Sequence, residues 1–314
     1  MRALKSLPKT LDETYERILK GISEEDSPMA ARALRWLVFS KRPLGVEELA
    51  EAAILNPDAE CLFDIGDRFD DPRDILHVLS SLVTTYTQGN IEIVSVAHFS
   101  VQECLVSSRM QPDIAELYQM GELSSEQMIA KSCLDYIHCY GNGTVQNKLP
   151  IIDRVLREDL TAYPLLDYCC TFWEDHFHAC EALGSDLAVL VVQSLKSQPW
   201  LNAWTRIRKL RSNWFLYTMA PPLYWAAYLQ LPSVAEELVE LGANVNAQGG
   251  LYGNALQAAC SRGNEAIVKL LLEKGANVGT QGGFYGTALQ AARSIGNEAI
   301  VKLLLEKGAN VGAE

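Results

Sequence analysis

The pattern of apolar and polar positions repeats every 33 residues near the end of the chain. The stretch "GNEAIVKLLLEKGANVG" occurs twice without change, at residues 263–279 and 296–312. The surrounding segments 248–280 and 281–313 differ at five positions, and a more divergent copy occupies residues 221–247. Each copy holds a short and a longer amphipathic segment, with glycines between and after them. The pattern therefore predicts two helices and a tight turn in every copy.

Residue types that favour helix ends flank both predicted helices of the last copy. Thr287 precedes the first helix and Gly296 follows it, and Asn297 and Gly308 flank the second helix in the same way. A hydroxyl or amide oxygen caps a helix N-terminus, and glycine accepts the left-handed conformation in which many helices end. The second helix presents a broad apolar face formed by Ile300, Val301, Leu303, Leu304 and Leu305. One helix pair cannot bury such a face, so we expect the copies to stack.

These copies resemble ankyrin repeats in their period, glycines and apolar positions, across about residues 215–313. The family tetrapeptide Thr-Pro-Leu-His appears as "NALQ" at 254–257 and as "TALQ" at 287–290. The resemblance implies a C-terminal ankyrin-repeat solenoid that binds a protein and performs no catalysis. Its expected repeats are about 215–247, 248–280 and 281–313.

The differences between the two closely similar copies suggest where a partner binds. Four of the five differences lie in the hairpin tip and the first helix, which form the concave surface in ankyrin proteins. Neutral drift after a recent duplication explains the same pattern, and the sequence leaves both explanations open. On the first explanation, the partner-binding residues are Leu251, Tyr252, Asn254, Gln257, Cys260 and Arg262, with Phe284, Tyr285, Thr287, Gln290, Arg293 and Ile295 as their counterparts.

A different pattern precedes the repeats, with three helical segments followed by two β-branched runs. Apolar stripes predict helices within 29–39 and 46–55, and residues 71–82 read as a third helix. Residues 82–87 and 91–99 flank a short turn that contains Gly89, which predicts a β-hairpin. Three helices and a two-stranded wing are the plan of a winged-helix module.

Several stretches of this region resemble one part of fungal NOD-like receptors, which are signal-transduction ATPases with a NACHT core. The stretches are "LPKTLDETYERIL" (7–19), "LRWLVFSKRPLGVEELAEA" (34–52), "VAHFSVQECL" (96–105) and "YPLLDYCCTFWEDH" (163–176). In that family a winged-helix segment and a helical segment link the ATPase to C-terminal repeats. The resemblance implies the same order in this chain.

We therefore expect a mainly α fold with a winged-helix-like module, a helical bundle and a C-terminal ankyrin-repeat solenoid. The expected domains are an N-terminal linker helix (1–26), a winged-helix-like domain (27–120), a helical domain (121–212) and the ankyrin repeats (213–314).

The sequence contains no Gly-x-x-x-x-Gly-Lys-Ser/Thr motif, so the ATPase activity of the family does not carry over to this chain. We expect the chain to correspond to the C-terminal portion of such a receptor, or to a gene that has lost the ATPase. No Gly-x-Ser-x-Gly or His-Glu-x-x-His motif occurs either. We therefore predict no catalytic residues, no cofactor and no enzymatic activity.

The densest group of metal-ligand residue types lies in "CCTFWEDHFHAC" at 169–180. The residues concerned are Cys169, Cys170, His176, His178 and Cys180. Zinc sites usually present paired Cys-x-x-Cys spacings, which this stretch lacks. An amphipathic packing helix is therefore favoured over a metal site.

Overall charge narrows the classes of partner. The net charge is −12, and the segment before the third predicted helix is acidic while the wing turn has no Lys or Arg, which argues against nucleic acid and anionic membranes as partners. No apolar run is long enough to span a bilayer, and eight irregularly spaced cysteines fit a reducing compartment. We expect a cytoplasmic protein, with the nucleus as the alternative compartment.

The function expected from these features is a non-catalytic protein-interaction and regulatory module. Its ankyrin face would bind a protein partner, and its other segments would pass that state to a NACHT ATPase in cis or in trans. The alternatives are an ankyrin-repeat cofactor in transcriptional regulation and a stand-alone adaptor or decoy. Because the last repeat has no polar cap, we also expect self-association through Ile300, Leu303 and Leu304.

Overall fold

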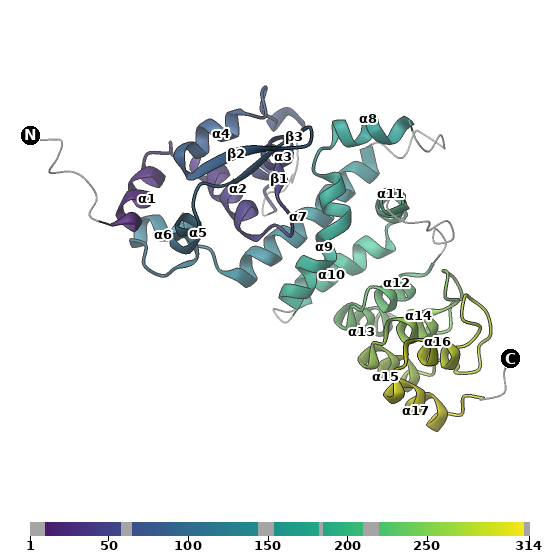
Figure 1. Cartoon of the computed structure of the whole chain (residues 1–314). Coiled ribbons are helices and arrows are strands. Elements are labelled where there is room, and N and C mark those ends of the chain that lie inside the picture. The colour runs from purple at the N-terminus through teal and green to yellow at the C-terminus, as the bar shows by residue number, and fades with distance from the viewer. Residues whose placement is uncertain (1–9, 58–64, 144–153, 182–184, 210–219, 311–314) are drawn as a thin grey trace, which may run out of the picture. The chain divides into compact units, whose positions relative to one another are not determined.

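The computed structural model describes residues 10–57, 65–143, 154–181, 185–209 and 220–310 (Figure 1). The described chain is mainly helical, with one small sheet in its N-terminal part, which confirms the predicted fold class. It divides into two compact units, one made of residues 1–139 and 150–180, the other of residues 140–149 and 181–314. No helix in the described ranges has both the length and the apolarity that a membrane crossing requires.

The first unit contains the winged-helix module. Helix α1 (Leu11–Lys20) precedes α2 (Ser27–Phe39), α3 (Val46–Ile54) and α4 (Asp74–Leu79). The antiparallel sheet has the order β1-β3-β2, with bounds Leu44–Gly45, Ile91–Val96 and Val83–Gln88. Helices α5 (Phe99–Val106) and α6 (Pro112–Tyr118) follow. Its core includes side chains with no exposed surface, among them Leu34, Trp36, Leu49 and Leu79.

Three details of the winged helix differ from the sequence prediction. Helix α4 is shorter than 71–82, because Asp71 accepts the Arg73 backbone N–H in a turn before the helix, and Ser80 takes a φ of +50° that ends it. The hairpin turn contains two residues, with Gly89 at a φ of +63°, because Gln88 still pairs with Ile91. Strand β1 was not predicted, since two residues carry no periodic signal.

The rest of the first unit consists of the N-terminal part of α7 (Glu122–Gly143), together with α8 (Arg154–Ala162) and α9 (Leu166–Cys180). The second unit begins with α10 (Ser185–Lys196) and α11 (Gln198–Lys209). The segment 121–212, expected as one helical domain, is thus divided between the two units. The expected domain boundaries remain a proposal, and residues 1–9 and 210–219, next to two of them, lie outside the described residues.

The ankyrin repeats form stacked helix pairs in the second unit. The pairs are α12 (Pro222–Tyr228) with α13 (Pro232–Glu240), α14 (Ala255–Arg262) with α15 (Glu265–Glu273), and α16 (Ala288–Ile295) with α17 (Glu298–Glu306). Helix α14 packs between α12 and α16, and α15 contacts both α13 and α17 (Figure 1). The predicted caps are confirmed, since Thr287 and Asn297 accept backbone N–H groups of the first turns of α16 and α17. Gly296 and Gly308 have φ values of +76° and +90° at the helix ends.

The N-terminal side of the array is covered by other helices of the same unit. Helix α10 packs on α13 and α12. The Glu181 carboxylate accepts hydrogen bonds from the Ser233 hydroxyl at 2.7 Å and the Ser233 backbone N–H at 3.2 Å. Trp204 on α11 stacks on Trp200 at 5.4 Å and meets Trp225 of α12 edge-on at 5.1 Å between ring centroids. These contacts bury one end of the solenoid without a further repeat.

The other end shows what a neighbouring repeat contributes, because α15 and α17 have the same sequence. Leu272 on α15 is 8% exposed, whereas its counterpart Leu305 on α17 is 39% exposed. Val268 is buried and its counterpart Val301 is only partly buried. The predicted exposure of Ile300 and Leu304 is wrong, since both have no exposed surface and pack within their own repeat. The face left uncovered consists of Val301 and Leu305, with Leu303 partly buried beside them.

This comparison predicts that the same Leu→Ala substitution destabilises α15 more than α17, although the two helices have the same sequence. Leu272→Ala removes a side chain enclosed by the next repeat and should lower the free energy of opening of α15 by about 2–4 kcal/mol. Leu305→Ala should cost less than about 1 kcal/mol in α17, because that side chain is already in water. Hydrogen exchange of the α15 and α17 amides, measured in the full chain by mass spectrometry, checks both values. Equal losses at the two positions would contradict the account of stacking.

Candidate functional site

The ankyrin hairpins place aromatic rings in a continuous row, which we call the aromatic ladder. It consists of Tyr228, Tyr252, Tyr285 and Phe284. Tyr252 lies 5.9 Å from Tyr228 and 5.6 Å from Tyr285 between ring centroids, with interplanar angles of 24° and 10°. Phe284 meets Tyr285 edge-on at 4.9 Å and is 68% exposed. The ladder therefore begins in the core of the first repeat and ends in water at the last.

Glycines allow the successive hairpins to approach closely enough for this stacking. A Cβ on Gly250, which has a φ of +78°, would lie 2.3 Å from the Tyr224 ring. A Cβ on Gly283, with a φ of +68°, would lie 2.1 Å from the Tyr252 carbonyl oxygen. Next to it, the Phe284 N–H donates to the Leu251 carbonyl at 2.9 Å. Only glycine fits either position, so the exposed ring of Phe284 stands on a firmly held loop.

Polar side chains of the first helices hold the hairpin of the next repeat. The Gln257 amide donates to the carbonyls of Gly282 at 2.8 Å and Gly286 at 3.1 Å. Asn254 caps α14 by accepting the Gln257 backbone N–H at 2.9 Å. Both side chains are buried. Gln257 therefore fixes one repeat to the next, and Asn254 fixes the start of the helix that carries Gln257.

The structure separates the twelve predicted partner-binding residues by exposure. Four of them are buried: Asn254, Gln257, Cys260 and Thr287. Four are partly buried: Leu251, Tyr252, Tyr285 and Gln290. Four are exposed: Arg262, Phe284, Arg293 and Ile295. Partner binding by all twelve remains a prediction, and the exposed residues are the ones that a partner reaches first.

Cys260 shows why a variable position is not always a contact position. It has no exposed surface in the middle of the array, and burial raises the pKa of its thiol to about 12. Its counterpart Arg293 is exposed on the last repeat. The two copies thus differ here in burial as well as in residue type, with a buried cysteine in one and an exposed arginine in the other.

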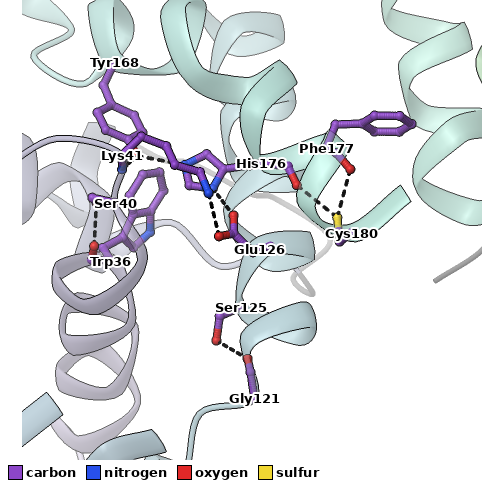
Figure 2. A network of polar contacts seen from close by, with 10 residues as sticks. All are labelled: Trp36, Ser40, Lys41, Gly121, Ser125, Glu126, Tyr168, His176, Phe177 and Cys180. Atoms are coloured by element: carbon purple, nitrogen blue, oxygen red, sulfur yellow. Dashed lines mark hydrogen bonds and ion pairs between the residues drawn. The ribbon is translucent and has the colours of Figure 1, made fainter. Parts of the chain in front are cut away.

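The Cys/His segment 169–180 forms a buried polar network in the first unit (Figure 2). The Nδ1 atom of His176, on α9, lies 2.5 Å from the Oε2 atom of Glu126, on α7. The ammonium of Lys41, from the loop after α2, donates a hydrogen bond to Glu126 Oε1 at 2.6 Å. The Tyr168 hydroxyl lies 2.8 Å from His176 Nε2 and accepts the Lys41 backbone N–H at 2.9 Å. The network joins three segments of the unit in a closed ring.

The hydrogen bonds of this network fit one protonation state. The Tyr168 hydroxyl uses its own proton toward His176 Nε2, so a neutral His176 carries its proton on Nδ1 and donates it to Glu126. Burial lowers the pKa of His176, although the Glu126 carboxylate acts in the opposite direction. Burial by itself would raise the pKa of Glu126, but the hydrogen bonds from His176 and Lys41 lower it on balance. A neutral His176 between a tyrosine and a carboxylate is thus the favoured state near pH 7.

The network leaves no lone pair of His176 for a metal ion. Cys169, Cys170 and Cys180 are buried, and the Cys180 thiol donates to the His176 carbonyl at 3.2 Å. In the described ranges, no group of three His, Cys, Asp or Glu side chains converges as a metal site requires. The network therefore holds the winged helix, α7 and α9 in one arrangement.

A second buried carboxylate binds the same elements together. Glu51 on α3 accepts the Tyr136 hydroxyl of α7 at 2.7 Å and two donors of the Arg68 guanidinium. Arg68 also donates to the Ala162 carbonyl at 2.7 Å. The sequence analysis missed Glu51 and Glu126. For Glu51 the signal was a carboxylate within a largely apolar helical stretch, which is buried only where a partner neutralises it, whereas Glu126 lies among Ser124, Ser125 and Gln127 and carried no such signal.

Comparison with known proteins agrees with this architecture. Residues 223–314 match the family model for ankyrin repeats, in three copies, and residues 15–116 match that for the winged helix domain of GPI inositol-deacylase. The azaphilone pigments biosynthesis cluster protein L of Monascus ruber is 33% identical over an alignment of 296 residues, which covers 85% of this chain and 59% of that protein. The chain thus spans about three fifths of the length of this curated relative. The predicted ankyrin repeats and winged-helix module are confirmed.

The buried histidine predicts a dependence of stability on pH. In the unfolded chain this histidine takes up a proton as the pH falls below about 6.5, whereas in the folded chain His176 stays neutral to a lower pH. The free energy of unfolding therefore falls as the pH falls below about 6.5. The lowered pKa of Glu126 adds a further loss in more acid solution, as that carboxylate is protonated. We expect the melting temperature of the first unit to drop between pH 7.5 and 5.5, and the drop to be smaller in His176→Gln.

The matched control for this experiment is His77→Gln, since the His77 side chain is 84% exposed. This variant should keep the full drop. Part of the drop should also remain in His176→Gln, because burial lowers the pKa of His138 as well. An unchanged drop in His176→Gln, or an equal reduction in both variants, would contradict the assignment.

Proposed function

We propose that the chain is a non-catalytic interaction and regulatory module that binds a protein through the exposed part of its concave ankyrin face. The observation that carries this proposal is the free end of the aromatic ladder, where Phe284 is largely exposed beside Tyr285. Aromatic side chains are enriched among the residues that dominate protein interfaces. An exposed phenylalanine on a solvent-facing loop has no role in the core of its own repeat.

The way in which Phe284 is held supports the same function. Its loop is fixed by the hydrogen bond to Leu251 and by the close approach of Gly283 to Tyr252. A ring that is already ordered loses little conformational entropy when a partner covers it. The ankyrin scaffold thus supplies a preorganised apolar contact.

For the first unit we propose the linking role that the resemblance to fungal NOD-like receptors implies. Its polar networks hold the winged helix, α7 and α9 together, as a segment that passes a binding event to a NACHT ATPase would require. The ATPase would act in cis or in trans. A free-standing adaptor or decoy without an ATPase has the same binding face and is the alternative.

The biological setting that we propose follows the curated relative. Its name places that protein in an azaphilone pigment biosynthesis cluster. We infer that this chain acts in such a cluster by binding or regulating another protein, and not by performing a biosynthetic step. The absence of a Gly-x-Ser-x-Gly nucleophile motif from the sequence supports a role without deacylase chemistry, whatever the name of the matching winged-helix family.

Partner capture with one exposed apolar side chain removed tests the binding face. Phe284→Ala should lower the recovery of at least one protein from an extract of the source organism by about tenfold, as loss of a central aromatic contact does. Leu241→Ala is the matched control, because Leu241 is 57% exposed and lies after α13, outside the concave surface. Quantitative mass spectrometry of the captured proteins gives the ratio. Identical recoveries with the two variants would refute the concave face as the binding site.

The alternative role as a cofactor in transcriptional regulation predicts that the winged helix binds DNA, and the proposed function predicts that it does not. Arg73, at the start of α4, already pairs with Glu92 at 2.9 Å, and Asp70, Asp71 and Asp74 lie around it. We therefore expect no mobility shift of a random 30-base-pair duplex by the full chain at either 50 or 150 mM salt, roughly the range over which phosphate contacts weaken. A shift at low salt that Arg73→Glu removes would favour the transcriptional role.

A further inference from the structure

Charge is distributed unequally between the two sides of the ankyrin array. The hairpins and first helices, residues 242–264 and 275–297, contain only two charged residues, Arg262 and Arg293. The second helices and the residues that end them carry the other charges of the repeats: Glu236, Glu237, Glu240, Glu265, Lys269, Glu273, Lys274, Glu298, Lys302, Glu306 and Lys307. In a chain with a net charge of −12, the hairpins and first helices carry only positive charge.

Both arginines are exposed near the ends of the first helices. The Arg262 guanidinium lies over the Tyr228 ring, 5.0 Å from its centroid, so one cation flanks the aromatic ladder. Among the described residues, no carboxylate lies within ion-pair distance of either guanidinium. Each guanidinium carries five N–H donors in a planar fork that matches a carboxylate. These donors are available to a ligand.

We propose that the partner of this face is an acidic peptide segment that carries an aromatic or large apolar residue. Its carboxylates would pair with Arg262 and Arg293, and its apolar side chain would cover Phe284 and Tyr285. This inference rests on the proposed function and names the chemistry of its partner. The segment therefore has two acidic residues near an aromatic or large apolar residue.

The negative charge of the rest of the chain limits where such a segment binds. Glu236, Glu237 and Glu240 of α13 repel it from the other side of the first repeat, whereas glutamates and lysines balance in and directly after α15 and α17. At physiological salt this repulsion is screened beyond about 8 Å. The local positive charge of the concave face therefore determines whether an acidic segment binds there. An acidic segment is thus directed to one face.

Selection from a random peptide library tests the proposal without assuming a ligand. A phage library of random twelve-residue peptides, selected on the immobilised full chain at 150 mM salt, should enrich sequences with Asp or Glu near Phe, Tyr or Trp. The tightest selected peptide, made with a fluorescent label, should lose at least about tenfold in affinity for Arg262→Glu/Arg293→Glu, as expected when two charge pairs become repulsive. Arg293→Glu alone, which disturbs no ring contact, should lose at least about threefold.

The matched control is Lys269→Glu/Lys302→Glu, which makes the same change in net charge at two equivalent exposed positions of α15 and α17. Its affinity for the peptide should stay within about twofold of the original, because exposed charges on the other side act weakly. Enrichment of basic or uncharged peptides, no enrichment, or equal losses in the two double variants would overturn the inference. The proposed function fails separately, when Phe284→Ala changes no captured partner.

Discussion

The second unit depends on one constraint, which is that a 33-residue repeat cannot bury its apolar face alone. Helices α15 and α17 have the same sequence, yet Leu272 of α15 is buried against the next repeat while its counterpart Leu305 of α17 is exposed. The same stacking lines up Tyr252 and Tyr285 at 5.6 Å and lets Gln257 hold the next hairpin. Burial of aliphatic surface thereby fixes the polar and aromatic side chains of the concave face. The proposed binding surface is thus a consequence of this packing.

The first unit is held together differently, because buried carboxylates join segments that are far apart in the sequence. Glu126 and Glu51 each lose water on folding and recover the cost through several hydrogen bonds from distant parts of the chain. Such networks tolerate only one arrangement of their partners. We infer that this selectivity for one arrangement, more than stability, is what the two networks contribute to the first unit.

Local signals in the sequence predicted much of this structure. Period, helix caps and glycines gave the ankyrin pairs, and the order of helical and β-branched segments gave the winged helix. Contacts across long separations were not predictable, since no periodicity links His176 to Glu126, 50 residues away. The burial of Asn254, Gln257, Cys260 and Thr287 was not predictable for a related reason. Variation identifies positions that tolerate change, while burial depends on which repeat lies beside them.

The proposed function depends on contact between Phe284, at the exposed end of the aromatic ladder, and a partner protein. A photoreactive phenylalanine analogue at position 284, introduced into the full chain and irradiated in an extract of the source organism, measures this contact directly. We expect a covalent adduct from position 284 and none from the same analogue at position 302, on the second helix of the same repeat. An adduct from position 302 with none from position 284 would contradict it.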